Sequence, residues 1–270
     1  MNSITTDEKL KPLRQNIHYF LKWTLISLVT GTVVGLVGTL FGHGIQLVTS
    51  FWKGHDWTLF LAPFAGLAIV WLYRVSHEEK NKGTDMVIES ISAGEDVTAA
   101  TAPLIFISTL LSHAVSASAG REGAALQLGG SLGNVIGKAI HLDEKDRKIA
   151  IMCGMSAGFA ALFGTPLAAG VFAMEVISIG VMYYAALVPC LFASFLGAAI
   201  SGKLGLVPEH YDIGAVPEFG LSGAVFAVVL GMLCACVGIF LCMILHQCGH
   251  LYRKYFPNPY LRVVAGAVIF

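Results

Sequence analysis

The chain has 270 residues, of which 56% are hydrophobic and 13% are charged, whereas about 25% of the residues in a typical soluble domain are charged. Lysines and arginines number 17, as do aspartates and glutamates, so the formal net charge is zero. Because a neutral chain exerts no bulk attraction on nucleic acid or acidic partners, no nucleic-acid partner is predicted.

Seven apolar runs contain no Asp, Glu, Lys or Arg. A soluble helical protein carries charge on one face of nearly every helix, whereas a transmembrane helix needs roughly 17–25 mostly apolar residues. Five of the runs reach or exceed that length, and a sixth just reaches it. The sequence therefore predicts an all-α integral membrane protein. The charge-free runs are residues 23–52, 57–73, 97–120, 123–137, 149–174, 176–202 and 219–252.

The first two apolar runs are flanked by basic segments. Residues 1–22 form a polar leader and residues 74–82 form a loop, and both carry several lysines and arginines. Because cytoplasmic segments carry an excess of Lys and Arg, we expect both in the cytoplasm, with Lys53 and Asp56 at the turn on the far side. The sequence therefore predicts a cytoplasmic leader at 1–22 and a multi-pass transmembrane domain at 23–270 in the cell membrane.

The middle of the chain contains shorter and broken segments. Residues 83–93 and 123–137 are too short to span a bilayer, and Pro166 interrupts the run 149–174. Half-length helices at membrane depth must direct their unpaired ends at protein or at a water-filled cavity, and in transporters such helices usually build the substrate site. The alternating charges of residues 143–148 predict a solvated loop.

The C-terminal segment begins an apolar run that it does not complete. After the Pro-Asn-Pro sequence at residues 257–259, the run stops at Phe270. About ten residues cannot cross ~30 Å of hydrocarbon as a helix. We therefore expect the sequence to be incomplete at this end.

The most specific feature is the segment GREGAALQLGGSLG at residues 120–133, whose Arg121 and Glu122 lie between apolar runs of 24 and 15 residues. The first turn of a helix leaves partly positive N–H groups unpaired, and a desolvated anion suits them. Gly120 and Gly123 remove side chains that would block a close approach. Glu122 can occupy such an anion site when ionised and leave it when protonated. Alternatively, Arg121 and Glu122 mark an interfacial helix start, although intramembrane ionisable residues favour a functional role.

Two further segments complete a recognisable pattern. FGTPLAAGVFAME at residues 163–175 has an F-x-x-P-L-A start and a Glu at its end, and GTDMV lies upstream at residues 83–87. With the GREGAALQLGGSLG segment, these motifs resemble the CLC family of chloride channels and anion–proton antiporters, in the order and spacing of its N-terminal half. The resemblance runs from about residue 17 to the end of the chain.

The resemblance implies a fold and an activity. The fold would be a CLC-like bundle of tilted and broken helices that forms one half of an inverted-repeat architecture. The activity would be transport of an anion, with chloride in first place and fluoride/proton antiport as the alternative, and not catalysis by an enzyme. The resemblance further implies a homodimer in a lipid bilayer, with a dimer surface that draws on residues 166–200 and with no cofactor.

The resemblance also assigns roles to single residues. Glu122 would be the gate, and Glu175 a structural carboxylate. Val176 stands where proton-coupled members often carry a second glutamate, and because valine cannot relay a proton, coupling of chloride to protons by the usual route is expected to be weak or absent. Ala124 replaces the proline that usually follows the gating residue. The predicted anion-binding residues are Thr84, Gly120, Arg121, Gly123 and Ala124.

Two alternatives from other classes remain open. Cys242, His246 and His250 follow at i, i+4 spacing, and histidine pairs at this spacing can bind zinc, so an intramembrane metalloenzyme centred on His246 and His250 is one alternative. The other is a membrane subunit that assembles but does not transport. The lone His43 and His113 are interpreted as packed residues that make a hydrogen bond.

Overall fold

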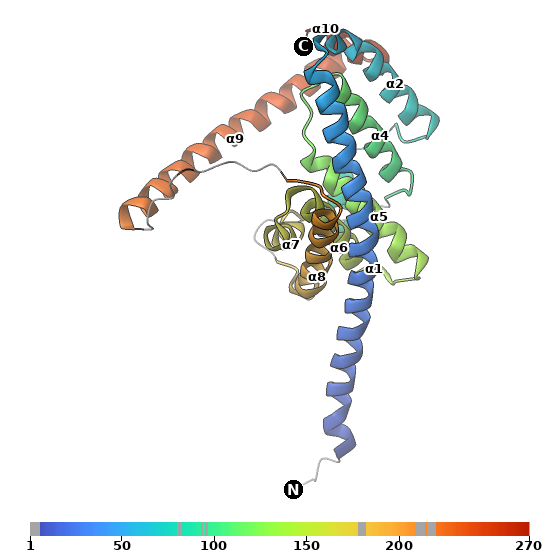
Figure 1. The fold of residues 1–270 in the computed structure, drawn as a ribbon, viewed down its shortest axis with the longest axis vertical. Helices are drawn as coiled ribbons and strands as arrows, with labels where there is room; N and C mark the ends of the chain where they lie inside the picture. Colours follow the sequence, from blue (N-terminus) through green and yellow to red (C-terminus); the bar gives the residue numbers. More distant parts are fainter. Residues whose placement is uncertain are drawn as a thin grey trace. The chain divides into compact units, whose positions relative to one another are not determined.

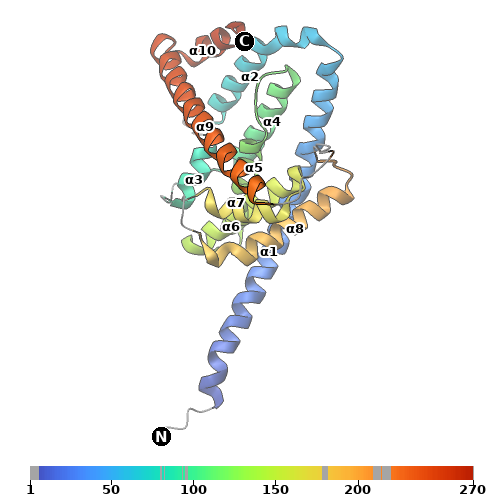
Figure 2. The same ribbon diagram turned by 90° about the vertical axis from the view of Figure 1, so that its left-hand side faces the viewer.

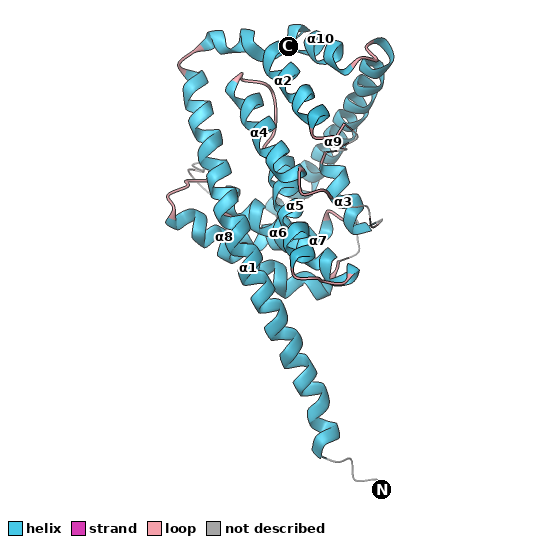
Figure 3. Ribbon diagram, turned by 90° about the vertical axis from the view of Figure 1, so that its right-hand side faces the viewer, coloured by secondary structure: helices cyan, strands magenta, loops and turns pink. Residues whose placement is uncertain are grey.

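The computed structural model describes residues 6–79, 81, 83–92, 94, 97–177, 182–208, 214 and 220–269, without the side chains of residues 6–13 and 15. These described residues form helices and no strands (Figure 3), which confirms the all-α prediction. The chain divides into two compact units, Met1–Pro208 and Glu209–Phe270, and each is considered by itself.

The first unit is organised around α1 (Thr6–Lys53), a continuous helix of 48 residues. At a rise of 1.5 Å per residue this helix is about 72 Å long, so it is much longer than the ~30 Å hydrocarbon core. Helices α5 to α8 gather around its central part, while its N-terminal part extends beyond them (Figures 1 and 2).

The chain turns at the end of α1 as the sequence predicts. Helix α1 ends at Lys53, and the 3₁₀ helix η1 (Asp56–Leu61) leads directly into α2 (Ala62–Val75). Pro63 lies in the first turn of α2, where its missing N–H has no intrahelical role. The predicted turn at Lys53 and Asp56 is therefore confirmed, and α2 goes on to pack against α4.

Three helices follow: α3 (Thr84–Ser92), α4 (Thr101–Ala114) and α5 (Glu122–Ala139). With 18 residues, α5 is longer than the 15-residue run that the sequence predicts to be too short. With nine residues, α3 is about 14 Å long, which confirms that it is too short to span. Helix α4 has 14 residues, far fewer than the charge-free run that contains it. The helix ends because the chain turns away: Val115 leaves helical geometry and Ser116 adopts a left-handed φ of 58°.

The next helices are α6 (Glu144–Phe163), α7 (Pro166–Glu175), η2 (Tyr184–Ala186) and α8 (Leu187–Lys203). Gly164 ends α6 in the left-handed conformation, with φ 66°, and Pro166 begins α7. Glycine just after one helix and proline at the start of the next are the residues that helix ends favour. The predicted break at Pro166 is therefore confirmed.

The prediction of a loop at residues 143–148 is wrong, because this segment is the first turn of α6. The carboxylate of Asp143 accepts a hydrogen bond of 2.8 Å from the Asp146 N–H and so caps the helix. Glu144 and Asp146 place negative charge in that first turn, where the helix dipole favours it.

Glycines allow α5 and α6 to cross with their backbones in contact. A Cβ added to Gly129 would lie 2.2 Å from the Gly154 carbonyl oxygen, and one added to Gly154 would lie 2.1 Å from that of Gly129. One turn further along α6, a Cβ on Gly197 of α8 would lie 2.6 Å from the Ala157 oxygen. Small residues are how membrane helices achieve such close packing, and here they join α5, α6 and α8 into one core.

The second unit contains α9 (Leu221–Tyr255) and α10 (Pro259–Ile269). In the described part of the chain, four helical segments are long and apolar enough to cross a membrane. Together they support a membrane location. They are Asn16–Lys53, Asp56–Val75, Tyr184–Lys203 and Leu221–Tyr255.

Candidate functional site

The predicted anion site is built on the first turn of α5, which begins at Glu122. The Ala125 N–H donates the opening bond of the helix, of 2.9 Å, to the Arg121 carbonyl. The N–H groups of Gly123 and Ala124 precede that bond, so the helix itself provides them with no acceptor. The Glu122 side chain is exposed. The helix start therefore offers backbone donors beside a carboxylate.

The start of α3 meets the start of α5. Thr84 is the first residue of α3 and follows Gly83, which adopts a left-handed φ of 70°. A Cβ added to Gly123 would lie 2.7 Å from the Thr84 hydroxyl oxygen, so this hydroxyl occupies the space that a side chain at residue 123 would need. The same hydroxyl is 3.3 Å from the side-chain nitrogen of Gln127. The structure thus brings together Thr84 and Gly123, which are far apart in sequence.

The side chains of Glu122 and Arg121 contact different residues. A Cβ added to Gly120 would lie 2.6 Å from Glu122 Oε2, so the carboxylate folds back into space that only a glycine leaves open. The Arg121 guanidinium lies 5.4 Å from the centre of the Phe163 ring, a cation–π contact. Because Phe163 is the last residue of α6, this contact brings the break between α6 and α7 to the same site.

Three further residues that the sequence singles out contribute no side chain to the helix start of α5. The Ala124 side chain is buried in the hydrophobic cluster around Phe41 and Leu128, so only its backbone N–H can serve an anion. Glu175 is exposed at the last residue of α7, and its structural role stays a prediction. Val176 is half-buried and packs against the larger hydrophobic cluster.

The histidines provide no metal site in the described residues. His246 and His250 lie on α9, but no group of three or more His, Cys, Asp or Glu residues among the described side chains could hold a metal ion. The metalloenzyme alternative is therefore not supported. His43 contacts the Leu204 carbonyl oxygen at 3.1 Å and His113 contacts the Thr109 oxygen at 2.8 Å, which confirms that both make hydrogen bonds within the fold.

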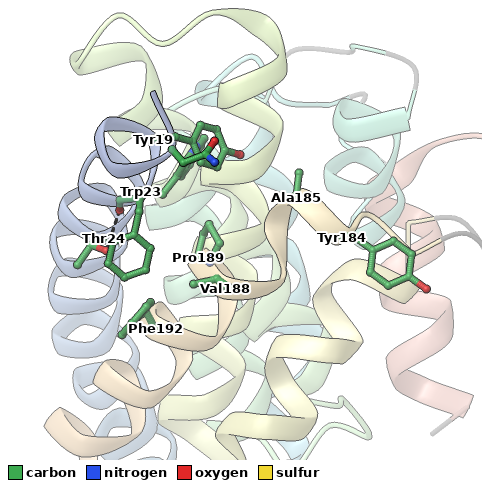
Figure 4. Close-up of a pocket in the computed structure, with 10 residues that line it drawn as sticks. Tyr19, Trp23, Thr24, Tyr184, Ala185, Val188, Pro189 and Phe192 are labelled. Carbon is green, nitrogen blue, oxygen red and sulfur yellow. Dashed lines mark hydrogen bonds between the residues drawn. The ribbon is translucent and has the colours of Figure 1, made fainter. Parts of the chain in front are cut away.

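A separate pocket lies between α1 and the start of α8, with a volume of 330 Å³. Its wall is largely aromatic, with Tyr19 and Trp23 from α1 and Phe192 from α8 (Figure 4). None of the predicted anion-binding residues lines it. The sequence does not predict this pocket because its walls come from segments more than a hundred residues apart.

Comparison with known families decides which kind of protein has this arrangement. The sequence pattern described as "Voltage gated chloride channel" matches residues 64–270, which is more than half of the chain. The chain belongs to the voltage-gated chloride channel (CLC) family. The resemblance seen in the sequence motifs is therefore confirmed.

Individual CLC relatives cover nearly all of the chain. The "Chloride/fluoride channel protein" of Pseudomonas syringae pv. tomato is 31% identical over 252 residues, which are 93% of this chain and 56% of the relative. The crystal structure of a CLC-type fluoride/proton antiporter aligns with a TM-score of 0.86 and 30% identity, covering 99% of this chain and 65% of the other. A slow cyanobacterial Cl⁻/H⁺ antiporter shares the fold, with a TM-score of 0.75 and 18% identity over 92% of this chain and 62% of the other.

These CLC relatives are longer than this chain. The chain spans about half the length of the curated relatives that it matches, 56% for the one from Pseudomonas syringae pv. tomato. The "H(+)/Cl(-) exchange transporter ClcA" of Yersinia pestis bv. Antiqua, a more distant relative at 22% identity, is covered to 54%. The likeness to CLC proteins therefore concerns one part of their fold, the part that contains the α3 and α5 helix starts.

Proposed function

We propose that this CLC-family protein transports an anion across a membrane, that it is a transporter and not an enzyme, and that Glu122 is its gate. The observation that carries the proposal is that the Thr84 hydroxyl lies close to Gly123 at the start of α5. Gly123 directly follows Glu122 in the sequence. Backbone N–H groups and a hydroxyl are donors that suit an anion. A tethered carboxylate competes for those donors and so controls access.

The proposed anion is fluoride, with chloride as the alternative that the sequence motifs favoured. Two relatives at 30% identity or more carry fluoride in their names. A relative named for chloride alone is 29% identical but over only 65% of this chain, and others named for chloride alone are more distant. Thr84, the backbone of Gly123 and Ala124, Gly120 and Arg121 would surround the anion.

We expect full-length protein in liposomes to release fluoride faster than chloride under the same gradient, by on the order of tenfold, the ratio that about 1.4 kcal/mol of differential binding produces. Anion-selective electrodes measure both fluxes, and protein-free liposomes are the control. Faster release of chloride would reverse the assignment of the substrate. If neither anion is released faster than from the control liposomes, the proposed function is refuted. The alternative of a membrane subunit that assembles but does not transport would then be favoured.

Proton movement is measured in the same liposomes. Val176 has no titratable group and packs against the hydrophobic core, and protons in a low-dielectric interior need a chain of ionisable groups or waters. We therefore propose that no proton passes through this side chain, and that any protons that accompany fluoride travel with Glu122. Proton uptake driven by chloride at a fixed ratio would contradict this account of the proton path.

We further propose that the protein is a homodimer in the cell membrane. Helices α7 and α8, within residues 166–200, present several large apolar side chains on their exposed faces, and such surfaces in a membrane protein pack against lipid or against another chain. The residues that support this dimer surface are Leu167, Val171, Phe172, Val188, Phe192 and Phe195.

The orientation proposed for the protein places the N-terminus and the loop after α2 in the cytoplasm, according to the positive-inside rule. Cysteines introduced as His18→Cys and Glu79→Cys, at exposed positions and in a background without native cysteines, should resist an impermeant thiol reagent in intact cells and react after permeabilisation. Trp57→Cys, which is 54% exposed next to the far turn, is the matched control and should react in intact cells. The opposite labelling pattern would contradict the orientation.

A further inference from the structure

The Gln127 side chain lies one helical turn after Gly123, where it is buried and 6% exposed. Its Nε2 atom is 3.3 Å from the Thr84 hydroxyl oxygen. Its Oε1 atom is equally buried and finds no hydrogen-bond donor among the described residues. An unsatisfied buried amide oxygen is unusual, and this one belongs to the side chain that contacts a predicted anion-binding hydroxyl.

The direction of the hydrogen bond determines what Thr84 can offer to an anion. An amide nitrogen can only donate, so the Thr84 oxygen is the acceptor in this contact. A hydroxyl carries a single proton, and that proton therefore remains available for another acceptor. Because the oxygen also lies beside Gly123, where a Cβ would stand, the free O–H is close to the first turn of α5.

The reversed amide would have the opposite effect. If Oε1 faced Thr84, it would accept the hydroxyl proton, and only the lone pairs of the threonine oxygen would remain for the site. Those lone pairs repel an anion. In the orientation of the structure, Nε2 faces the hydroxyl and Oε1 finds no donor among the described residues. An anion beside Thr84 favours the orientation with Nε2 toward the hydroxyl.

We propose that Gln127 is a positioning residue that sets the affinity of the site for its anion, by donating to Thr84 and so directing the threonine proton to the anion. This inference rests on the proposed function, since it assumes that Thr84 contacts the transported anion. Gln127 itself does not contact the anion. Its effect on binding therefore depends on the Thr84 hydroxyl, which distinguishes it from a residue that only stabilises the fold.

The test is a double-mutant cycle on the full-length protein in liposomes, with fluoride and then chloride as the probe. Gln127→Met keeps the approximate size but loses the donor, and Thr84→Val keeps the shape but loses the hydroxyl. Thr84→Val is expected to raise the anion concentration for half-maximal flux about tenfold, the effect of losing one hydrogen bond to a charged acceptor. Gln127→Met should raise it by a smaller factor, because the Thr84 hydroxyl is no longer oriented but can still donate. The double variant should match Thr84→Val, and Thr84→Ser should retain the response to Gln127→Met.

Two controls separate an effect on binding from damage to the helix. Ser131→Ala removes another buried polar contact of α5, the 3.1 Å bond to the Thr98 carbonyl, and should leave the half-maximal concentration unchanged. Gln127→Glu keeps the shape of the side chain and replaces Gln127→Met in the test if that variant fails to fold. Its carboxylate accepts the Thr84 proton, so anion affinity should fall at least as far.

The outcomes distinguish the inference from the proposed function. Wild-type liposomes that release no anion would refute the proposed function, and with it this inference. Wild-type flux with an unchanged half-maximal concentration in Gln127→Met, or in Gln127→Glu where that variant replaces it, would refute the inference alone. Additive effects of Gln127→Met and Thr84→Val would also refute it, because they would show that Gln127 acts without Thr84.

Discussion

Glu122→Gln is expected to change anion flux more than any other replacement of a single charged residue. Glutamine has the shape of the protonated glutamate, so the variant carries a gate that no longer competes for the donors of Gly123 and Ala124. At neutral pH we expect flux to rise roughly tenfold, as for the loss of a competitor worth about 1.4 kcal/mol, and to become insensitive to pH. Any proton movement that accompanies wild-type transport should disappear.

Liposome flux at several pH values measures this effect. Glu175→Gln is the matched control, because Glu175 is also an exposed carboxylate at a helix end of the first unit, but it lies at the last residue of α7 and not at a helix start. Its flux should keep the pH response of the wild type. Flux of Glu122→Gln that equals wild type under every ionic condition would show that this carboxylate is not the gate.

Gly154→Ala is expected to prevent stable folding. The added Cβ would lie 2.1 Å from the Gly129 carbonyl oxygen and 3.1 Å from the Gly133 Cα, and these are backbone atoms that cannot rotate away. Overpacking usually costs about 1–3 kcal/mol, and we expect a cost at or above the upper end of that range because neither helix can yield without moving the other. Thermal unfolding of purified protein, followed by size-exclusion chromatography, measures the loss.

Gly202→Ala is the control for this substitution, since Gly202 is also helical, in the last turn of α8, but a Cβ there would meet no atom within 4 Å. Alanine favours helix more than glycine by about 1 kcal/mol, so this variant should be as stable as wild type or slightly more so. Equal stability of Gly154→Ala and Gly202→Ala would contradict the close crossing of α5 and α6.

Much of the fold follows from the sequence because charge marks the limits of most membrane segments. The turn at Lys53 and Asp56 and the break at Pro166 are examples, since charged residues and proline have strong local preferences for the ends of membrane helices. The end of α4 is different, because no charge or proline accompanies the left-handed turn at Ser116. The first turn of α6 differs for another reason: Asp143 with acidic residues after it is a helix-start signal, but the alternating charges of the same residues are also typical of a solvated loop.

The candidate site was predictable in part. The motif around Glu122 indicates a helix start, and the family resemblance points to Thr84, but neither indicates which side chains hold that hydroxyl. The contact between Gln127 and Thr84 joins residues 43 positions apart and depends on how α3 packs on α5, where a Cβ on Gly130 would lie 2.5 Å from Val87. Contacts of this kind arise from tertiary packing, so no local sequence pattern predicts them.

The crossing of Gly129 and Gly154 has a consequence for the speed of the proposed gate. Two backbones in direct contact leave neither helix room to move toward the other, so we expect α5 and α6 to move together. If Glu122 is the gate, as proposed above, its opening is then expected to occur by bond rotation within the Glu122 side chain. Rotamer changes of exposed side chains take picoseconds to nanoseconds, whereas collective helix shifts take microseconds to milliseconds. The slow step of turnover is therefore expected elsewhere than in the movement of this gate.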